Sequence, residues 1–151
     1  MIAGAKTKAL KVFADERGRV MEILTCDDDL FVQFGQLYMT TAYPGMVKAW
    51  RAHRIRVDNF AVVRGRIKLV LYDSRENSTT YGQVDEFYLG EENPLLVQVP
   101  AGVLHGFQCL GGDEAFVLNC TTMPYNPADR DLVALDPRSP EVPYDWQKMK
   151  P

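Results

Sequence analysis

The sequence is poor in the residues that build metal sites and disulfide scaffolds. Only two histidines occur, His53 and His105, so a four-ligand metal site made mainly of histidine is nearly excluded within one chain. The cysteines are three, an odd number, and no C-x-x-C motif is present. We therefore expect no bound metal, no disulfide framework and a reducing, cytoplasmic compartment.

Long apolar runs and a surplus of basic charge are missing as well. No window approaches 18 consecutive apolar residues, so no transmembrane helix is expected. Lysine and arginine number 17 against 20 aspartates and glutamates, which gives a formal net charge of −3. We therefore expect neither nucleic acid nor a membrane surface as a partner.

What the chain does contain is a series of short β-type runs separated by turn residues. Its 151 residues predict one domain, spanning 1–151. No long window has a helical stripe, and prolines at 127, 137, 140, 143 and 151 predict an irregular tail. The pattern thus favours an all-β sandwich or small barrel. Strands are predicted over residues 19–24, 36–42, 46–52, 60–63, 66–73, 84–89, 95–99, 105–110 and 114–122.

A set of motifs follows in order along almost the whole chain. The pieces are Asp15-Glu16-Arg17-Gly18 with Glu22, then Gln36 nine residues before Gly45, the segment from Asp73 to Gly82, Val99-Pro100-Ala101-Gly102 with His105-Gly106-Phe107, and finally Tyr125-Asn126-Pro127, Asp136-Pro137 and Asp145-Trp146. Their order and spacing resemble the dTDP-4-dehydrorhamnose 3,5-epimerase family. The resemblance implies a cupin jelly roll, a homodimer and a reaction without a cofactor.

The resemblance also implies a chemistry. Members of that family act on nucleotide-linked 4-keto-6-deoxyhexoses, whose keto group acidifies the protons at C3 and C5. A base removes one proton, an enolate forms, and a proton returns from the opposite face. Such a reaction needs a general base, an acid on the other face and stabilisation of the enolate oxygen.

Several of the family's catalytic positions are occupied differently here. Arg51 stands at the position of the catalytic histidine, and an arginine is a poor general base. Asn119 stands at the position of the acid tyrosine, and an amide does not cycle a proton. Lys48 takes the place of an arginine and Asp58 that of a lysine, while the carboxylate that supports the family's histidine has no clear counterpart.

Three residues remain as catalytic candidates. Residues i and i+2 of a strand share a face, so His53 should face the same pocket as Arg51 and could act as a displaced base. A strand-end contact with solvent or with a second copy is the alternative for His53. His105 is expected in the pocket, with a structural bond to the backbone as its alternative. Tyr125 is a candidate proton donor or sugar contact, or else a rim aromatic that packs the tail.

Substrate binding is assigned to a further group of residues. The cations are suited to a sugar diphosphate, and Glu22 to the nucleotide or to an arginine. Arg75 is expected to pair with Asp73 rather than to bind phosphate, and Trp50 to point away from the pocket. The predicted binding residues are Arg17, Glu22, Gln36, Lys48, Arg51 and Asn119.

We therefore predict an isomerase, an epimerase of a dTDP- or CDP-linked 4-keto-6-deoxyhexose in deoxysugar or surface-polysaccharide biosynthesis. One alternative is a keto-sugar isomerase of the 3,4-ketoisomerase type, which uses the same enediolate but returns the proton elsewhere. The other is a cupin that binds a sugar nucleotide without catalysis. The replaced histidine and tyrosine favour the last hypothesis, whereas Arg17, Glu22, His105 and Tyr125 favour the enzymatic ones.

Overall fold

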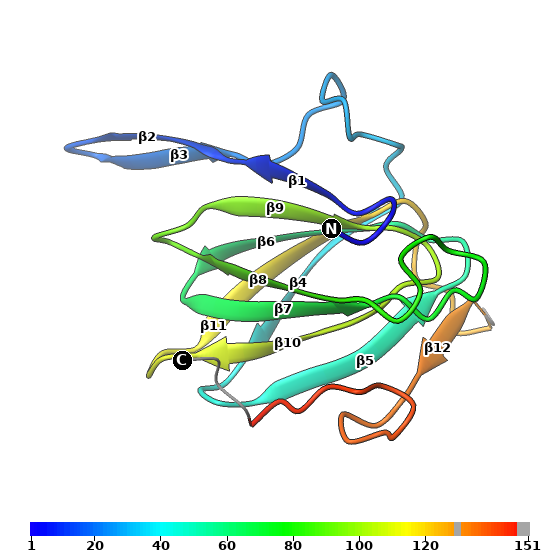
Figure 1. Ribbon diagram of the computed structural model, residues 1–151. Helices are drawn as coiled ribbons and strands as arrows, with labels where there is room; N and C mark the ends of the chain where they lie inside the picture. Colours follow the sequence, from blue (N-terminus) through cyan, green and yellow to red (C-terminus); the bar gives the residue numbers. More distant parts are fainter. Residues whose placement is uncertain (129–130, 148–151) are drawn as a thin grey trace.

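The computed structural model describes residues 1–128 and 131–147, and these ranges form strands and turns without a helix (Figure 1). The all-β prediction is therefore confirmed. Pro151, the last of the tail prolines, lies outside the described residues. Within them, no helix is long and apolar enough to cross a membrane.

Two five-stranded antiparallel sheets form the body of the molecule. The first has the order β1-β9-β6-β11-β4 and the second the order β12-β5-β10-β7-β8. Consecutive strands along the chain therefore often belong to different sheets, as in a jelly roll. The strands of the first sheet are β1 (Lys6–Ala9), β9 (Leu95–Val99), β6 (Asp58–Arg64), β11 (Ala115–Thr121) and β4 (Gln36–Ala42). Those of the second are β12 (Leu132–Ala134), β5 (Val47–His53), β10 (Leu104–Leu110), β7 (Arg66–Tyr72) and β8 (Val84–Gly90).

The main core lies between the two sheets. In β7 the side chains of Ile67, Leu69 and Leu71 alternate toward this core and are fully buried. They meet apolar side chains from the first sheet, among them Phe60 of β6 and Val117 of β11. This packed interior fixes the spacing of the sheets and so the shape of the open end beside it.

A second apolar cluster lies on the outer face of the second sheet, beneath the C-terminal tail. Trp50 of β5 and Val70 of β7 pack there against Trp146, and the two indole rings are 5.0 Å apart. Trp50 therefore points away from the interior, as predicted. The tail, which runs beside β5 in Figure 1, thereby packs against the outer side of that strand.

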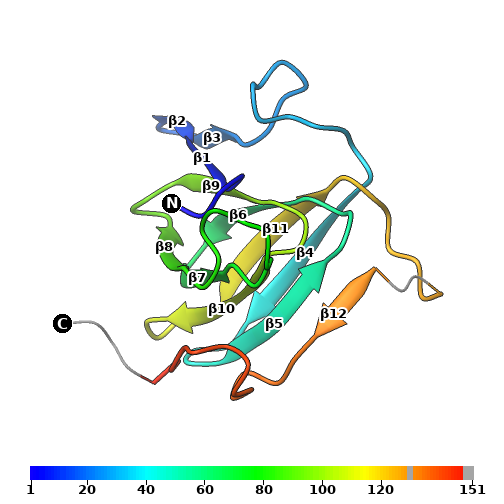
Figure 2. The same cartoon turned by 45° about the vertical axis from the view of Figure 1, so that its right-hand side comes forward.

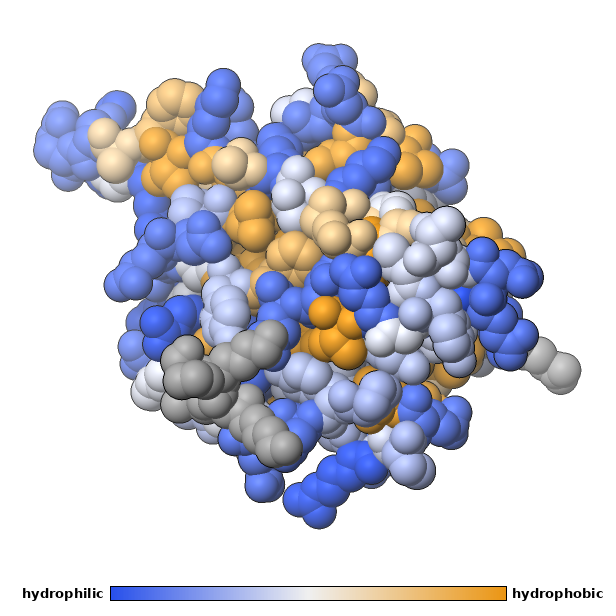
Figure 3. Space-filling model, viewed as in Figure 1, coloured by the Kyte–Doolittle hydropathy of each residue, from blue (hydrophilic) through white to orange (hydrophobic). Residues whose placement is uncertain are grey.

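A two-stranded hairpin projects from the body. It consists of β2 (Lys11–Asp15) and β3 (Gly18–Glu22), and both views show it standing clear of the two sheets (Figures 1 and 2). Phe13 and Val20 are 59% and 61% exposed on it, and Figure 3 shows hydrophobic surface at this end of the molecule. The exposed apolar side chains make the hairpin a candidate surface for protein–protein contact.

Candidate functional site

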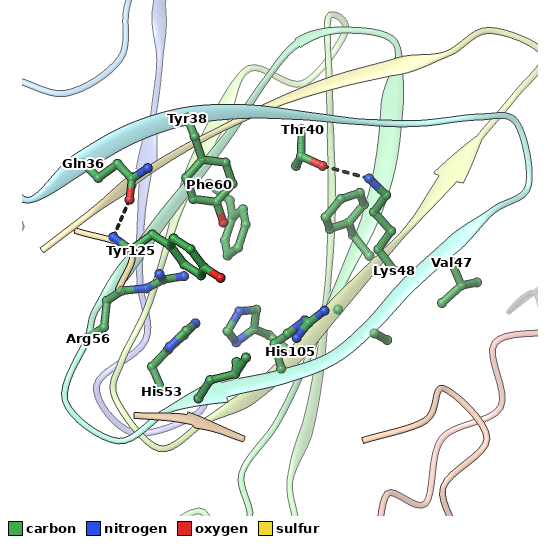
Figure 4. A pocket seen from close by; sticks show the side chains of 15 residues that line it. Gln36, Tyr38, Thr40, Val47, Lys48, His53, Arg56, Phe60, His105 and Tyr125 are labelled. Atoms are coloured by element: carbon green, nitrogen blue, oxygen red, sulfur yellow. Dashed lines mark hydrogen bonds between the residues drawn. The ribbon is translucent and has the colours of Figure 1, made fainter. Parts of the chain in front are cut away.

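A cavity of about 730 Å³ opens between the two sheets beside β4, β5 and β10 (Figure 4). Six of the predicted site residues line it, namely Gln36, Lys48, Arg51, His53, His105 and Tyr125. The other lining residues are Tyr38, Thr40, Val47, Ala49, Arg56, Phe60, Gly106, Phe107 and Leu132. The wall thus joins imidazoles, phenols and cations, which suits an anionic substrate and proton transfer.

His53 ends β5 with its side chain in the cavity wall and only 10% exposed. Its Nδ1 lies 3.6 Å from Oδ2 of Asp131. The carboxylate is itself held in place, since it accepts the backbone N–H groups of Ile55 at 2.8 Å and Arg56 at 3.3 Å. A proton on Nδ1 would face this carboxylate, which leaves Nε2 as the basic nitrogen.

The surroundings of His53 keep its ring neutral. Burial lowers the pKa of His53 below its ordinary value, and the charges of Arg56 and His105 act in the same direction. Asp58 and Asp131 oppose the shift without reversing it. At neutral pH the imidazole is therefore unprotonated and able to accept a proton.

His105 lies in β10, within the same wall. Its Nδ1 is 3.0 Å from the carbonyl oxygen of Val103, and because a carbonyl only accepts, Nδ1 has the proton. Nε2 is then unprotonated in the neutral ring, 3.6 Å from Oδ2 of Asp58, which is too long for a hydrogen bond. Burial lowers the pKa of His105 although Asp58 opposes this, so the neutral form is favoured.

The two histidine rings are neighbours. Their centroids are 6.5 Å apart, with His105 also 5.4 Å from the ring of Phe60. Both belong to the second sheet, so this wall of the cavity has two neutral imidazoles.

Asp58 and Asn119 form a buried polar cluster at the opposite side, on β6 and β11. Asp58 accepts a hydrogen bond from Nε of Arg56 at 3.0 Å and another from Nδ2 of Asn119 at 2.9 Å. The same nitrogen of Asn119 donates to the hydroxyl of Tyr38 at 2.8 Å. Asn119 is fully buried and does not line the cavity, but it donates a hydrogen bond to Tyr38, which does.

Two cations stand at the exposed part of the cavity. Lys48 donates to Oγ1 of Thr40 at 2.9 Å. Arg51 lies three residues further along β5, beyond a bulge in the pairing with β10. Both residues are exposed, so their charges are available to a ligand. A diphosphate is the anion that such a pair would suit.

Gln36 and Tyr125 meet at the rim. Oε1 of Gln36 accepts the backbone N–H of Tyr125 at 2.6 Å, which ties the start of the tail to β4. Tyr125 is nevertheless 71% exposed. Its ring therefore has room to pack on a ligand at the mouth.

The structure places Arg17 and Glu22 elsewhere, on the projecting hairpin, and neither lines the cavity. Arg17 is 82% exposed and pairs with Asp15 at 2.6 Å. Arg75 pairs with Asp73 at 2.8 Å, as predicted. Its guanidinium therefore supports the loop after β7.

A bulge shapes the β5 wall. His105 of β10 is opposite Arg51, whereas Phe107 is opposite Lys48. The interval on β5 is therefore one residue longer than the facing interval on β10, which defines a β-bulge. Gly106 lies at this point, and a Cβ there would come within 2.3 Å of the Cβ of Ala49. The absence of a side chain at Gly106 lets the two strands approach.

Sequence reasoning missed Tyr38 and Asp131. Tyr38 had a usable signal, because the alternation that pairs His53 with Arg51 also places Tyr38 and Thr40 on the face of Gln36. Asp131 had none, since it reaches His53 through the irregular tail. The described residues contain no group of three or more His, Cys, Asp or Glu side chains that could hold a metal ion.

Comparison with known proteins gives a consistent result. Residues 1–150 match the family described as dTDP-4-dehydrorhamnose 3,5-epimerase. The chain is 37% identical over 146 residues to the spore coat polysaccharide biosynthesis protein SpsL of Bacillus subtilis, covering 97% of both chains. It is 33% identical to the probable low-salt glycan biosynthesis epimerase Agl13 of Haloferax volcanii, covering 95% of this chain and 89% of the relative. The crystal structure of a dTDP sugar isomerase from Desulfovibrio desulfuricans G20 superposes with a TM-score of 0.94 at 34% identity, covering 99% of this chain and 94% of the other.

Proposed function

Because this chain belongs to the dTDP-4-dehydrorhamnose 3,5-epimerase family, we propose that its cavity inverts C3, C5 or both of a dTDP- or CDP-linked 4-keto-6-deoxyhexose. Membership makes the protein a sugar-nucleotide epimerase, an isomerase of deoxysugar or polysaccharide biosynthesis. The choice of carbon and nucleotide is the proposed part. The three free cysteines support a reducing, cytoplasmic setting.

His53 is the proposed general base, and its environment is the observation that carries the proposal. A neutral imidazole, nearly shielded from solvent and steadied by Asp131, can take the acidic proton next to the keto group. Arg51 two residues earlier holds a positive charge beside it. That charge would favour the enolate that forms as the proton leaves.

Lys48, Arg51 and Tyr125 are proposed to hold the substrate. The two cations suit the diphosphate, and the exposed ring of Tyr125 suits a sugar or base at the mouth. Gln36 would act through its bond to the Tyr125 backbone. His105 would complete the polar wall beside the sugar.

A second copy is proposed to cover the projecting hairpin. Phe13 and Val20 leave apolar surface exposed there, and Arg17 and Glu22 lie on the same element, outside the cavity of their own chain. In a homodimer, Arg17 and Glu22 of one chain would contact the substrate bound in the cavity of the other chain. Their assignment to substrate binding thus depends on the dimer.

Hydrogen exchange tests the reaction. The protein is incubated in deuterated water with dTDP- and CDP-linked 4-keto-6-deoxyglucose, and the sugar is followed by NMR and mass spectrometry. We expect deuterium at an inverted C3 or C5. His53→Asn should lower that rate by about 10²–10⁴-fold, the usual worth of a general base.

The same experiment has informative contrary results. If no deuterium enters with either nucleotide, the cavity is not an epimerase site for these sugars. Exchange that His53→Asn leaves unchanged removes His53 as the base. A keto group that moves to C3 assigns the ketoisomerase reaction instead, which two imidazoles on one wall would suit.

A further inference from the structure

The cavity has different chemistry on its two sides. His53 and His105 come from the second sheet, whereas Tyr38 comes from β4 at the edge of the first. Figure 4 shows the Tyr38 ring reaching into the cavity across from the two imidazoles. A ligand between the sheets would therefore have a neutral base on one face and a phenol on the other.

Asn119 fixes the orientation of this phenol. Tyr38 and Asn119 are direct partners in the β4–β11 pairing. The amide oxygen of Asn119 accepts the backbone N–H of Asn59 at 3.0 Å, so its nitrogen must be the atom that faces Tyr38 and Asp58. The two amide hydrogens are then used on the Tyr38 oxygen at 2.8 Å and on Asp58 at 2.9 Å.

The direction of that bond has a chemical consequence. Because Tyr38 accepts from Asn119, its own hydroxyl hydrogen is not used in this contact, and no protein acceptor for it occurs among residues 1–128 and 131–147. The hydrogen can thus be offered to a ligand. After it leaves, the Asn119 N–H would stabilise the charge on the phenolate oxygen.

We propose that Tyr38 is the proton donor on the face of the sugar opposite His53, and that Asn119 is its positioning residue. The inference rests on the proposed epimerase function. His53 takes the proton next to the keto group, and the C–H electron pair passes into the enolate. The enolate carbon then takes the proton of the Tyr38 hydroxyl from the other face. Water reprotonates the phenolate and removes the proton from His53.

The position of Tyr38 also accounts for the amide at residue 119. By resemblance, that position holds the acid tyrosine of the family, and an amide there cannot replace it. The neighbouring strand supplies a phenol directly opposite, on β4 instead of β11. Tyr125 is the rival donor, but it lies at the rim and is 71% exposed, whereas Tyr38 is partly buried in the wall.

The test separates removal of a proton from inversion. Wild-type protein, Tyr38→Phe and Tyr125→Phe are incubated in deuterated water with the 4-keto sugar nucleotide that the wild type converts. In Tyr38→Phe we expect inversion to fall by about 10²–10⁴-fold, while His53 still exchanges deuterium into the uninverted sugar. Tyr125→Phe should change both rates together. Tyr43→Phe, an exposed phenol outside the cavity, is the control that leaves both unchanged.

Three results overturn the proposal. They are inversion by Tyr38→Phe at the wild-type rate, loss of exchange together with inversion in a folded Tyr38→Phe protein, and selective loss of inversion in Tyr125→Phe. A wild type without exchange contradicts the epimerase function instead. Should Tyr38→Phe fail to fold by circular dichroism, a fluorinated tyrosine at position 38 keeps the ring and makes the phenol more acidic. The alkaline limb of the inversion rate must then move to lower pH, and an unmoved limb overturns the proposal.

Discussion

At the scale of single residues, the proposed base and proton donor lie a short step along or between strands from the residues at the family's catalytic positions. His53 lies two residues beyond Arg51 on one face of β5, and Tyr38 lies across from Asn119 on the next strand. Each step keeps the side chain directed at the same cavity or cluster. A change of residue at a family position therefore does not by itself indicate loss of the chemistry.

Asp131 offers a test of how its carboxylate sets the pKa and orientation of His53. Asp131→Asn should lower kcat on the order of tenfold or more, as part of the roughly 10²–10⁴-fold worth of a general base. Asp131 raises the pKa of His53, so its removal lowers that pKa further. Because the neutral ring is the active form, activity falls as the pH drops through this pKa. The acid limb of the pH–rate profile should move to lower pH.

The control for this variant is Asp136→Asn. Asp136 accepts the backbone N–H of Arg138 in the tail and does not line the cavity, so its profile should match the wild type. An Asp131→Asn profile with an unmoved acid limb would mean that the carboxylate only supports the loop around Ile55.

Residue-level prediction from the sequence succeeded where strand alternation was the only requirement. It placed Arg51 and His53 on one face and Trp50 on the other. It could not find Asp131, because the path of an irregular tail is set by tertiary contacts such as Trp146 against Trp50. The catalytic roles themselves stay predictions.

At the scale of elements, Gly106 is the residue that lets β5 and β10 approach at the bulge. Gly106→Ala should lower the free energy of unfolding by about 1–3 kcal/mol, since the added Cβ would overlap Ala49 and force the strands apart. Chemical denaturation measures this change. The shift of β5 should also reduce exchange activity, because that strand holds His53.

Gly112→Ala is the matched control. Nothing lies within 4 Å of a Cβ at Gly112, so the expected change is within about 0.5 kcal/mol of zero. Equal stability of the two alanine variants would show that the backbone at Gly106 relaxes to admit a methyl group.

Most strands were predictable because their apolar residues alternate or run continuously between turns. Residues 36–42 and 95–99 match β4 and β9 completely. The prediction missed β1, β2 and β12. The first two have four and five residues with little burial and no alternation of buried apolar side chains, and the third has only three residues, paired to β5. Such strands exist through their partners more than through their composition.

At the scale of the whole molecule, the projecting hairpin predicts association. We expect wild-type protein to sediment with twice the 17.1 kDa mass of one chain. Placing charge on the apolar surface, in the double variant Phe13→Glu and Val20→Glu, should yield the monomer. Tyr81→Glu, on the loop between β7 and β8, should remain a dimer. A monomeric wild type would contradict the proposed pairing.

The bulge in β5 has a consequence for how this cavity can change. Downstream of it, Arg51 and His53 face the cavity while Trp50 and Ala52 face the tail, so the bulge sets the phase of the strand. Loss of Ala49 would remove the extra residue of the bulge, and Lys48 would then lie two positions from Arg51 instead of three. Arg51 and His53 would still face the cavity. Loss of a residue beyond the bulge would instead exchange the two faces of the strand. The length of β5 can therefore change at the bulge without turning its histidine away from the cavity.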